Sequence, residues 1–254
     1  MKRETWFDAL RGFAALLVVW GHFAPVIYSP ETIPNVITYF IYCFHIPLFF
    51  FISGYSALYQ KDSNSFKDIL LKSINSIMPA ILMGIGLIVI YITIYNVDIG
   101  KSLLMQTMAS NWFLLTLATI SIMTYFFRYY KMNIRMVLLI SLFGALLTGL
   151  LVPAVSKLFL YFFFYLLGIL YKKGEFKIDS RKLVLALMFF IPFSIWYGFH
   201  TDWGEIVNIY AKLGTAFPGI IIVVYIFKRW EKEGVLSFLG QQTLEIILST
   251  YGYT

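Results

Sequence analysis

The sequence has few charged residues and almost no cysteine. Only 13% of its 254 residues are charged whereas 60% are hydrophobic, and this composition lies outside the range of soluble globular domains. Cys43 is the single cysteine, so no disulfide can form within the chain. The three histidines lie far apart, and neither a zinc-ligand spacing, a glycine-rich phosphate loop nor a nucleophile elbow occurs. The low content of charged residues therefore predicts a membrane protein, and the spacing of the histidines predicts that it has no metal site.

What the sequence does contain is a series of long apolar runs. Several reach about 20 residues, which is enough for a helix to cross the roughly 30 Å hydrocarbon core of a bilayer. No linker or soluble segment interrupts them, so residues 1–254 are expected to form one domain, an all-α, polytopic transmembrane helical bundle. The apolar runs predict about nine spans, at residues 6–27, 36–59, 73–95, 111–127, 134–152, 157–171, 183–199, 206–227 and 237–254.

The basic residues fall on alternate connections between these spans. Cytoplasmic loops are the ones enriched in Lys and Arg, so the N-terminus is predicted to be cytoplasmic. The net charge of +7 follows from these loops and does not indicate a nucleic-acid partner. Most of the Lys and Arg residues lie at the N-terminus and in the segments 61–72, 128–135, 172–182 and 228–232.

Three ionisable residues, Asp8, Arg11 and His22, lie within the first apolar run, Phe7–Phe23. In an α-helix the step from Arg11 to His22 returns to within about 20° of the same face, about 16.5 Å along the axis. Asp8 precedes Arg11 by one helical turn, within reach of an ion pair. Charged residues inside a membrane helix are costly and normally face a protein interior or a watery cavity. The shared face of this helix is therefore the candidate active site.

The second predicted span brings further polar residues to this region. It runs in the opposite direction, so Ser53 and Gly54 lie near its cytoplasmic end at the depth of Arg11, and His45 lies near mid-membrane. Ser53 and Gly54 are candidates for an anion site built from backbone N–H groups, although small residues equally permit close helix packing. His45 is either a second proton-handling group or a core histidine. Arg11 is either part of this candidate site or a structural residue. In the second case its guanidinium is neutralised by Asp8 and extends to the nearby membrane interface.

Two later residues complete the candidate site. Trp112 begins the fourth predicted span at the outer face, at about the depth of His22. A tryptophan there either contacts a sugar or belongs to the interfacial belt. Glu245 lies mid-membrane with no partner on its own helix, so Arg11, Lys72 or a histidine is its expected partner.

These segments resemble the acyltransferase-3 family, whose members are membrane enzymes that O-acylate, mostly O-acetylate, envelope glycans. The run Phe7–Ala15 followed by His22 is similar to the first-helix signature of that family, and His45–Tyr55 is similar to its second-helix element. The similarities keep the family's order along nearly the whole chain. Shorter ones lie at Trp112–Leu114, Phe162–Gly168 and Phe238–Ile246.

The resemblance implies an enzyme that moves an acyl group, mostly acetyl, from cytoplasmic acyl-CoA to a hydroxyl of an extracytoplasmic sugar, polysaccharide or lipid-linked glycan. It implies a multi-pass protein of the bacterial plasma (inner) membrane. Its partners are then acyl-CoA, the glycan and the lipid bilayer, with acyl-CoA (acetyl-CoA) as a substrate and no bound cofactor.

The same resemblance gives the residues their expected roles. His22 is the general base or the transient acyl carrier, because imidazole titrates near neutral pH. Asp8 is the second catalytic residue and orients Arg11, whose guanidinium suits the phosphates of the donor. The substrate-binding residues are Arg11, Ser53, Gly54, His45, Trp112 and Glu245.

Two other functions fit the same residues. A transporter or flippase for a polysaccharide or lipid-linked sugar would use His22 and Glu245 to gate the pathway or to relay protons. The other is an inactive family member that lacks a final helix, because the family typically has ten spans and about nine are predicted here.

Overall fold

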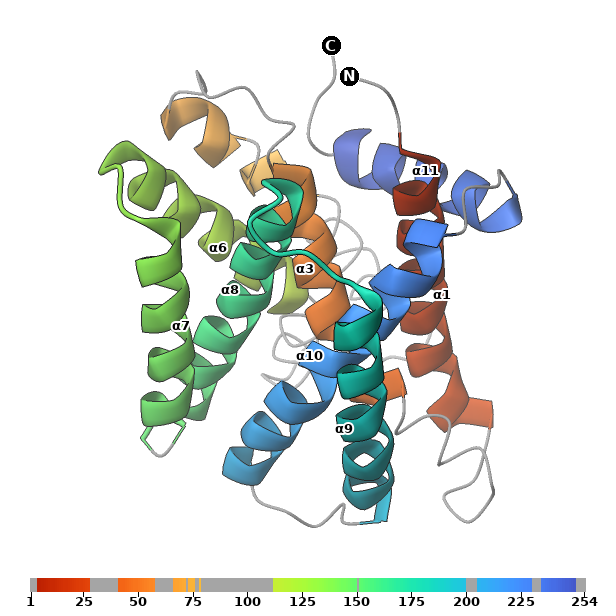
Figure 1. The fold of residues 1–254 in the computed structure, drawn as a ribbon. Coiled ribbons are helices and arrows are strands. Elements are labelled where there is room, and N and C mark those ends of the chain that lie inside the picture. Colours follow the sequence, from red (N-terminus) through yellow and green to blue (C-terminus); the bar gives the residue numbers. More distant parts are fainter. Residues whose placement is uncertain are drawn as a thin grey trace, which may run out of the picture. The chain divides into compact units, whose positions relative to one another are not determined.

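The structure is a computed structural model of the chain, and every secondary-structure element in the part that it describes is an α-helix (Figure 1). The all-α prediction is confirmed for this part. Most of the third predicted span, 73–95, lies outside the described residues. The structure describes residues 4–27, 41–57, 66–71, 73–75, 78, 112–149, 151–199, 205–229 and 234–249.

The helices coincide with the predicted spans. Each of the other eight predicted spans contains one of them, with shifts of a few residues at the ends and a later start for the second. The helices are α1 (Thr5–Ile27), α3 (His45–Ala57), α6 (Trp112–Tyr129), α7 (Ile134–Thr148), α8 (Pro153–Lys172), α9 (Ser180–Phe199), α10 (Glu205–Arg229) and α11 (Val235–Ser249).

Three segments among the described residues are long and apolar enough to cross a membrane. They are Trp112–Tyr129, Ala154–Lys172 and Tyr210–Arg229, which form α6 and most of α8 and α10. Their length and composition agree with a membrane protein. The count of nine spans and the cytoplasmic N-terminus stay predictions.

Contacts between the helices divide the chain into two compact units. Unit 1 comprises residues 1–60 and 133–244, and holds α1, α3, α7, α8, α9, α10 and most of α11. Unit 2 comprises residues 61–132 and 245–254, and holds α6. The candidate residues of the first and second predicted spans all belong to unit 1.

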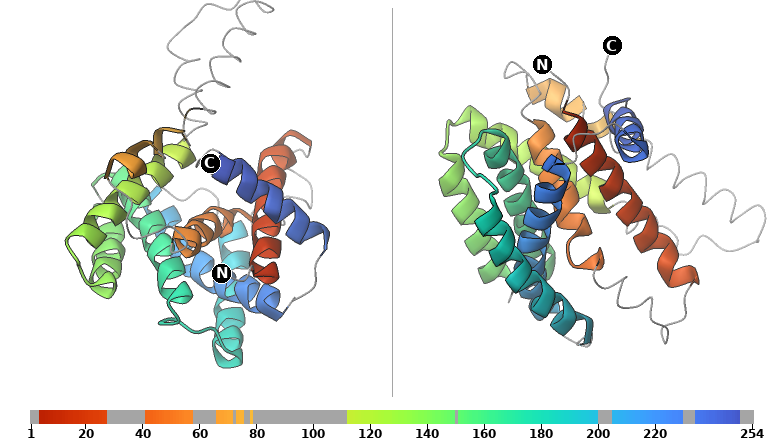
Figure 2. Two further views of the ribbon diagram at one scale, coloured as in Figure 1. Left: turned by 90° about the horizontal axis from the view of Figure 1, so that it is seen from above. Right: turned by 45° about the vertical axis from the view of Figure 1, so that its right-hand side comes forward.

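The helix α8 is the core of unit 1, and α3 packs along it. The two backbones meet at glycines, because a Cβ on Gly54 would lie 1.8 Å from the carbonyl oxygen of Tyr165. A Cβ on Gly168 would lie 2.0 Å from the carbonyl oxygen of Phe51. Since no side chain fits at either position, these glycines set how closely α3 and α8 approach. On other faces of unit 1, α7 packs against α8 and α9 packs against α10 (Figure 2).

A second glycine contact joins the first helix to the last. Gly12 of α1 faces Gly240 of α11, and a Cβ on Gly12 would lie 2.0 Å from the carbonyl oxygen of Leu236. A Cβ on Gly240 would lie 1.7 Å from the carbonyl oxygen of Asp8. The backbone of α11 therefore rests directly on the turn of α1 that carries the candidate acidic residue.

Local sequence signals explain how α8 begins and ends. Pro153 occupies the first turn, where its missing N–H costs nothing. After the last turn, Gly174 adopts φ 74°, a left-handed conformation that suits glycine. Its N–H donates to the carbonyl of Tyr171 and that of Glu175 donates to the carbonyl of Leu170, which is the Schellman arrangement. The chain therefore turns sharply at Gly174, just after Lys172, which is a residue of the site described next.

A candidate active site at the start of α1

The first element of the site is a buried ion pair on one face of α1. Nη1 of Arg11 lies 3.3 Å from Oδ1 of Asp8, as the spacing of one turn predicted. The side chains are only 8% and 4% exposed, respectively. The Cζ atom of Arg11 also lies 4.3 Å from the centroid of the Phe7 ring, a cation–π contact. A charge buried this deeply requires partners, and Asp8 is one of them.

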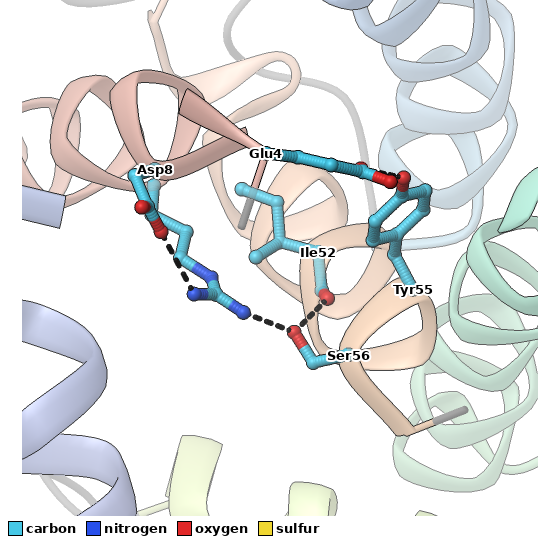
Figure 3. Close-up of polar contacts among 6 residues, drawn as sticks. Glu4, Asp8, Ile52, Tyr55 and Ser56 are labelled. Carbon is cyan, nitrogen blue, oxygen red and sulfur yellow. Dashed lines mark hydrogen bonds and ion pairs between the residues drawn. The ribbon is translucent and has the colours of Figure 1, made fainter. Parts of the chain in front are cut away.

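A neighbouring helix supplies a further partner of the guanidinium. Nη2 of Arg11 donates to Oγ of Ser56 on α3 at 2.8 Å, and the same hydroxyl donates to the carbonyl of Ile52 at 2.9 Å (Figure 3). The hydroxyl hydrogen is committed to Ile52, so a lone pair of Ser56 points at Arg11. The guanidinium is therefore held between an acid on α1 and a hydroxyl on α3.

A second polar cluster lies just before α1. Nζ of Lys172, at the end of α8, donates to Oε1 of Glu4 at 2.8 Å and to Oη of Tyr55 at 3.2 Å. The Tyr55 hydroxyl in turn donates to Oε2 of Glu4 (Figure 3). Burial by itself would raise the pKa of Glu4, but the hydrogen bonds from Lys172 and Tyr55, with the charges of Lys172 and Lys228, lower it overall.

These clusters show that several basic segments meet at one end of unit 1. Lys172 contacts Glu4 directly, and Lys228 of α10 lies close enough for its charge to act on the same carboxylate. Nε of Arg135, at the start of α7, lies 3.0 Å from Oε2 of Glu175 in the turn after α8. The N-terminus and the basic segments around residues 135, 172 and 228 therefore share an end of the unit, as their alternation in sequence predicted.

This end of unit 1 carries two cationic side chains with defined hydrogen-bond partners. The guanidinium of Arg11 donates to Asp8 of its own helix and to Ser56 of α3. The ammonium of Lys172 donates to Glu4, which precedes α1, and to Tyr55 of α3. Such groups suit phosphate or carboxylate oxygens. Among the described residues, no group of three His, Cys, Asp or Glu side chains is placed to hold a metal ion.

A comparison with known protein families identifies the family of the chain. The sequence model of one family, described as an acyltransferase domain, matches residues 4–249, from Glu4 to the end of α11. The chain belongs to the acyltransferase-3 family. The match supports an acyltransferase activity and includes both polar clusters. No curated protein and no solved structure matches the chain.

Two predicted residues of this acyltransferase have described backbones but side chains outside the described residues. His22 lies in α1, so the prediction that one continuous helix carries Arg11 and His22 is confirmed. Glu245 lies in α11. Trp112 is the first residue of α6, in unit 2, and is 39% exposed. The roles of these residues stay predictions.

His45 is buried at the start of α3. Its Nδ1 lies 2.9 Å from the carbonyl oxygen of Ile41, and its ring meets the edge of Tyr42 at 5.1 Å between centroids. A carbonyl only accepts hydrogen bonds, so Nδ1 carries a proton and Nε2 is the basic nitrogen of the neutral ring. The same tautomer is expected whether His45 is a core histidine or a proton-handling group, so this hydrogen bond is compatible with both interpretations.

The structure also changes which residues accompany Arg11. Ser53 is half-buried, and the α3 hydroxyl that contacts the guanidinium is that of Ser56, one turn further on. Gly54 packs against the backbone of α8. Of the two interpretations given for Gly54 above, an anion site or close helix packing, this contact is the one expected from close packing. Glu4, Lys172 and Tyr55 were missed by the sequence analysis. The sequence feature that could have predicted this cluster is the acidic residue directly before the first apolar run. The basic loops are predicted to lie on the same side of the membrane as this residue and could supply its partner.

Proposed function

We propose that this acyltransferase is an integral-membrane enzyme that moves an acyl group, acetyl in the first instance, from cytoplasmic acyl-CoA to a glycan hydroxyl. The acceptor is a sugar, polysaccharide or lipid-linked glycan on the outer side of the bacterial plasma membrane. The observation that supports this most directly is the buried Arg11, held by Asp8 and Ser56 at one end of a helix that also carries His22.

The donor end of the site is assigned to Arg11. Its planar guanidinium has five N–H donors, and its hydrogen bonds to Asp8 and Ser56 help to keep it in a defined orientation. A pre-oriented guanidinium binds phosphate oxygens with little further loss of side-chain entropy. Asp8 and Ser56 therefore act through Arg11 and need not touch the donor.

The reacting end is assigned to His22. As a general base, it removes the proton from the acceptor hydroxyl, whose oxygen attacks the thioester carbonyl carbon. The carbon–sulfur bond then breaks, and the proton passes to the leaving thiolate, giving an ester and free CoA. In the other route, the imidazole takes the acyl group first and then passes it to the hydroxyl.

The helical geometry separates these two ends. His22 follows Arg11 by about 16.5 Å along an ideal helix, so the phosphates and the thioester of one extended donor fit different levels of the same face. The basic segments that meet at the Arg11 end support a cytoplasmic location for the phosphates, because cytoplasmic loops are enriched in Lys and Arg.

The test is acyl transfer by the purified full chain in lipid nanodiscs. Labelled acetyl-CoA and a panel of glycans are supplied, and the wild type is compared with His22→Ala, Arg11→Lys and Leu185→Ala. Leu185 lies on the exposed face of α9 and serves as the control. We expect loss of transfer in His22→Ala, a raised KM for acetyl-CoA in Arg11→Lys, and unchanged transfer in Leu185→Ala. Transfer by His22→Ala at the wild-type rate would rule out the proposed role.

A further inference from the structure

The carboxylate of Glu4 is bound as a ligand would be bound. Lys172 donates to one of its oxygens at 2.8 Å, and the hydroxyl of Tyr55 donates to the other. These donors come from different helices, α8 and α3, and converge on a residue that precedes α1. Both oxygens of one anionic group are thus satisfied by a pair of fixed donors.

The surroundings of Glu4 carry more positive charge and more donors than one carboxylate uses. Nζ of Lys228 lies 5.5 Å from the centre of the Tyr171 ring, and the Tyr171 and Tyr55 rings lie 6.0 Å apart. The Tyr171 hydroxyl is buried and has no hydrogen-bond partner within the part of the chain that the structure describes. A buried hydroxyl without a partner is costly, which indicates a missing acceptor beside Tyr171.

The backbone of Glu4 is held independently of its side chain. The carbonyl of Glu4 accepts hydrogen bonds from the N–H groups of Phe7 and Asp8, at 3.0 and 3.2 Å, and so begins α1. The side chain is 32% exposed. Rotation of the carboxylate away from Lys172 therefore leaves the start of the helix intact.

We propose that Lys172, Tyr55, Tyr171 and Lys228 form a phosphate-binding site that Glu4 occupies when no ligand is bound. A carboxylate has two oxygens and uses two donors, whereas a terminal phosphate group presents three and uses the Tyr171 hydroxyl as well. The second ammonium, on Lys228, balances the greater charge of the phosphate. The site takes the phosphate or diphosphate group of a soluble molecule or the phosphate of an anionic lipid. Its identification with the acyl donor rests on the proposed function, whereas the phosphate site itself does not.

The experiment measures binding of inorganic pyrophosphate to the purified full chain in phosphatidylcholine nanodiscs. Glu4→Gln removes the competing charge and leaves a neutral group of the same size. The matched control is Glu175→Gln, which removes the same charge at the same end of unit 1 from a carboxylate that pairs with Arg135. We expect Glu4→Gln to bind pyrophosphate roughly tenfold more tightly than the wild type, and Glu175→Gln to match the wild type.

Further variants connect the binding to the proposed donors. In the Glu4→Gln background, Lys172→Met is expected to abolish pyrophosphate binding and Tyr171→Phe to weaken it severalfold. Each variant is first checked for a cooperative melting transition and a monodisperse elution profile. If Glu4→Gln binds no more tightly than Glu175→Gln, or if Lys172→Met binds as tightly as its parent, the site does not exist.

A second experiment distinguishes a soluble phosphate from the phosphate of a lipid headgroup as the ligand of the site. The Glu4→Gln variant is placed in nanodiscs containing phosphatidylglycerol, and pyrophosphate binding is measured again. Weaker binding there assigns the site to an anionic lipid headgroup, and unchanged binding assigns it to a soluble phosphate. No acyl transfer is measured in either arm, so failure of the proposed transferase function and failure of this site give different results.

Discussion

The hydroxyl of Ser56 lies 2.8 Å from Nη2 of Arg11 and links α3 to the buried ion pair of α1. This oxygen accepts from a charged donor, and hydrogen bonds to charged groups contribute about 1.5–3 kcal/mol. If the guanidinium binds the acyl donor, its orientation depends on Ser56. Ser56 is then a positioning residue for Arg11.

The first prediction concerns the replacement of this hydroxyl. Ser56→Ala should raise the KM for the acyl donor about tenfold and leave kcat and the KM for the acceptor nearly unchanged. Ser56→Thr keeps the hydroxyl and should restore the KM. Ser194→Ala is the control, because the Ser194 hydroxyl donates to the carbonyl of Phe190 within its own helix. Steady-state kinetics with each substrate varied separately provide the measurement. An unchanged donor KM in Ser56→Ala would contradict the positioning role.

The second prediction follows from the lowered pKa of Glu4. The usual value is 4.5, and the hydrogen bonds and charges around Glu4 outweigh the effect of burial. A carboxylate whose pKa is lower in the folded state stabilises the protein above its usual pKa. That stabilisation is lost as the pH falls through the folded value.

Glu4→Gln should therefore lower the melting temperature at pH 7. The loss should correspond to less than about 1 kcal/mol, because the carboxylate is about a third exposed to solvent. The gap between variant and wild type should shrink as the pH is lowered through 4.5 and below. Thermal unfolding in one detergent at several pH values measures the gap. A gap that stays constant over this range would mean that the Glu4 charge contributes nothing.

The third prediction concerns the closest approach of α3 and α8. Gly54→Ala places a Cβ 1.8 Å from a backbone oxygen of α8, so the helices must separate. Overpacking of this kind costs typically 1–3 kcal/mol, and more where backbone must move. The control is Gly234→Ala, since a Cβ there would meet nothing within 4 Å. Melting temperatures of the two variants should differ clearly, and equal values would contradict the glycine contact.

The fourth prediction links the last helix to activity. Gly240→Ala places a Cβ 1.7 Å from the carbonyl oxygen of Asp8, and relief of this clash moves either α11 or the turn that carries Asp8. We expect transfer activity to fall more than tenfold, because a displacement of about 1 Å can cost 10²-fold in rate. Acyl transfer is measured at a temperature where the variant is still folded, again with Gly234→Ala as the control. Full activity in Gly240→Ala would show that α11 does not support the site.

The sequence alone was sufficient to predict the described helices and one ion pair. Apolar runs of membrane length coincide with the described helices, and the Asp8–Arg11 contact follows from helical periodicity alone. The hydroxyl beside Arg11 was not predictable in the same way. Nearly every residue of α3 is apolar or small, so its pattern does not show which face packs on α8. The register is set instead by the contact of Gly54 with Tyr165, and it brings Ser56 to the guanidinium.

The Glu4 cluster depends on contacts that no local spacing encodes. Lys172 lies 168 residues from Glu4 in sequence, and their pairing exists only because α1 and α8 begin and end at the same level. The alternation of basic loops indicated that these segments share a side, but it did not indicate which side chains touch. The roles of His22, Trp112 and Glu245 are still predictions from the sequence.

The contact between Gly12 and Gly240 has a consequence for the order in which the protein is made. The turn of α1 that carries Asp8 is translated long before the α11 backbone that rests on it. Until residue 240 has emerged, the turn at Asp8 lacks this cover. A nascent chain therefore completes the packing around Asp8 only after α11 has emerged, so the surroundings of this residue depend on a contact between segments that lie far apart in the sequence.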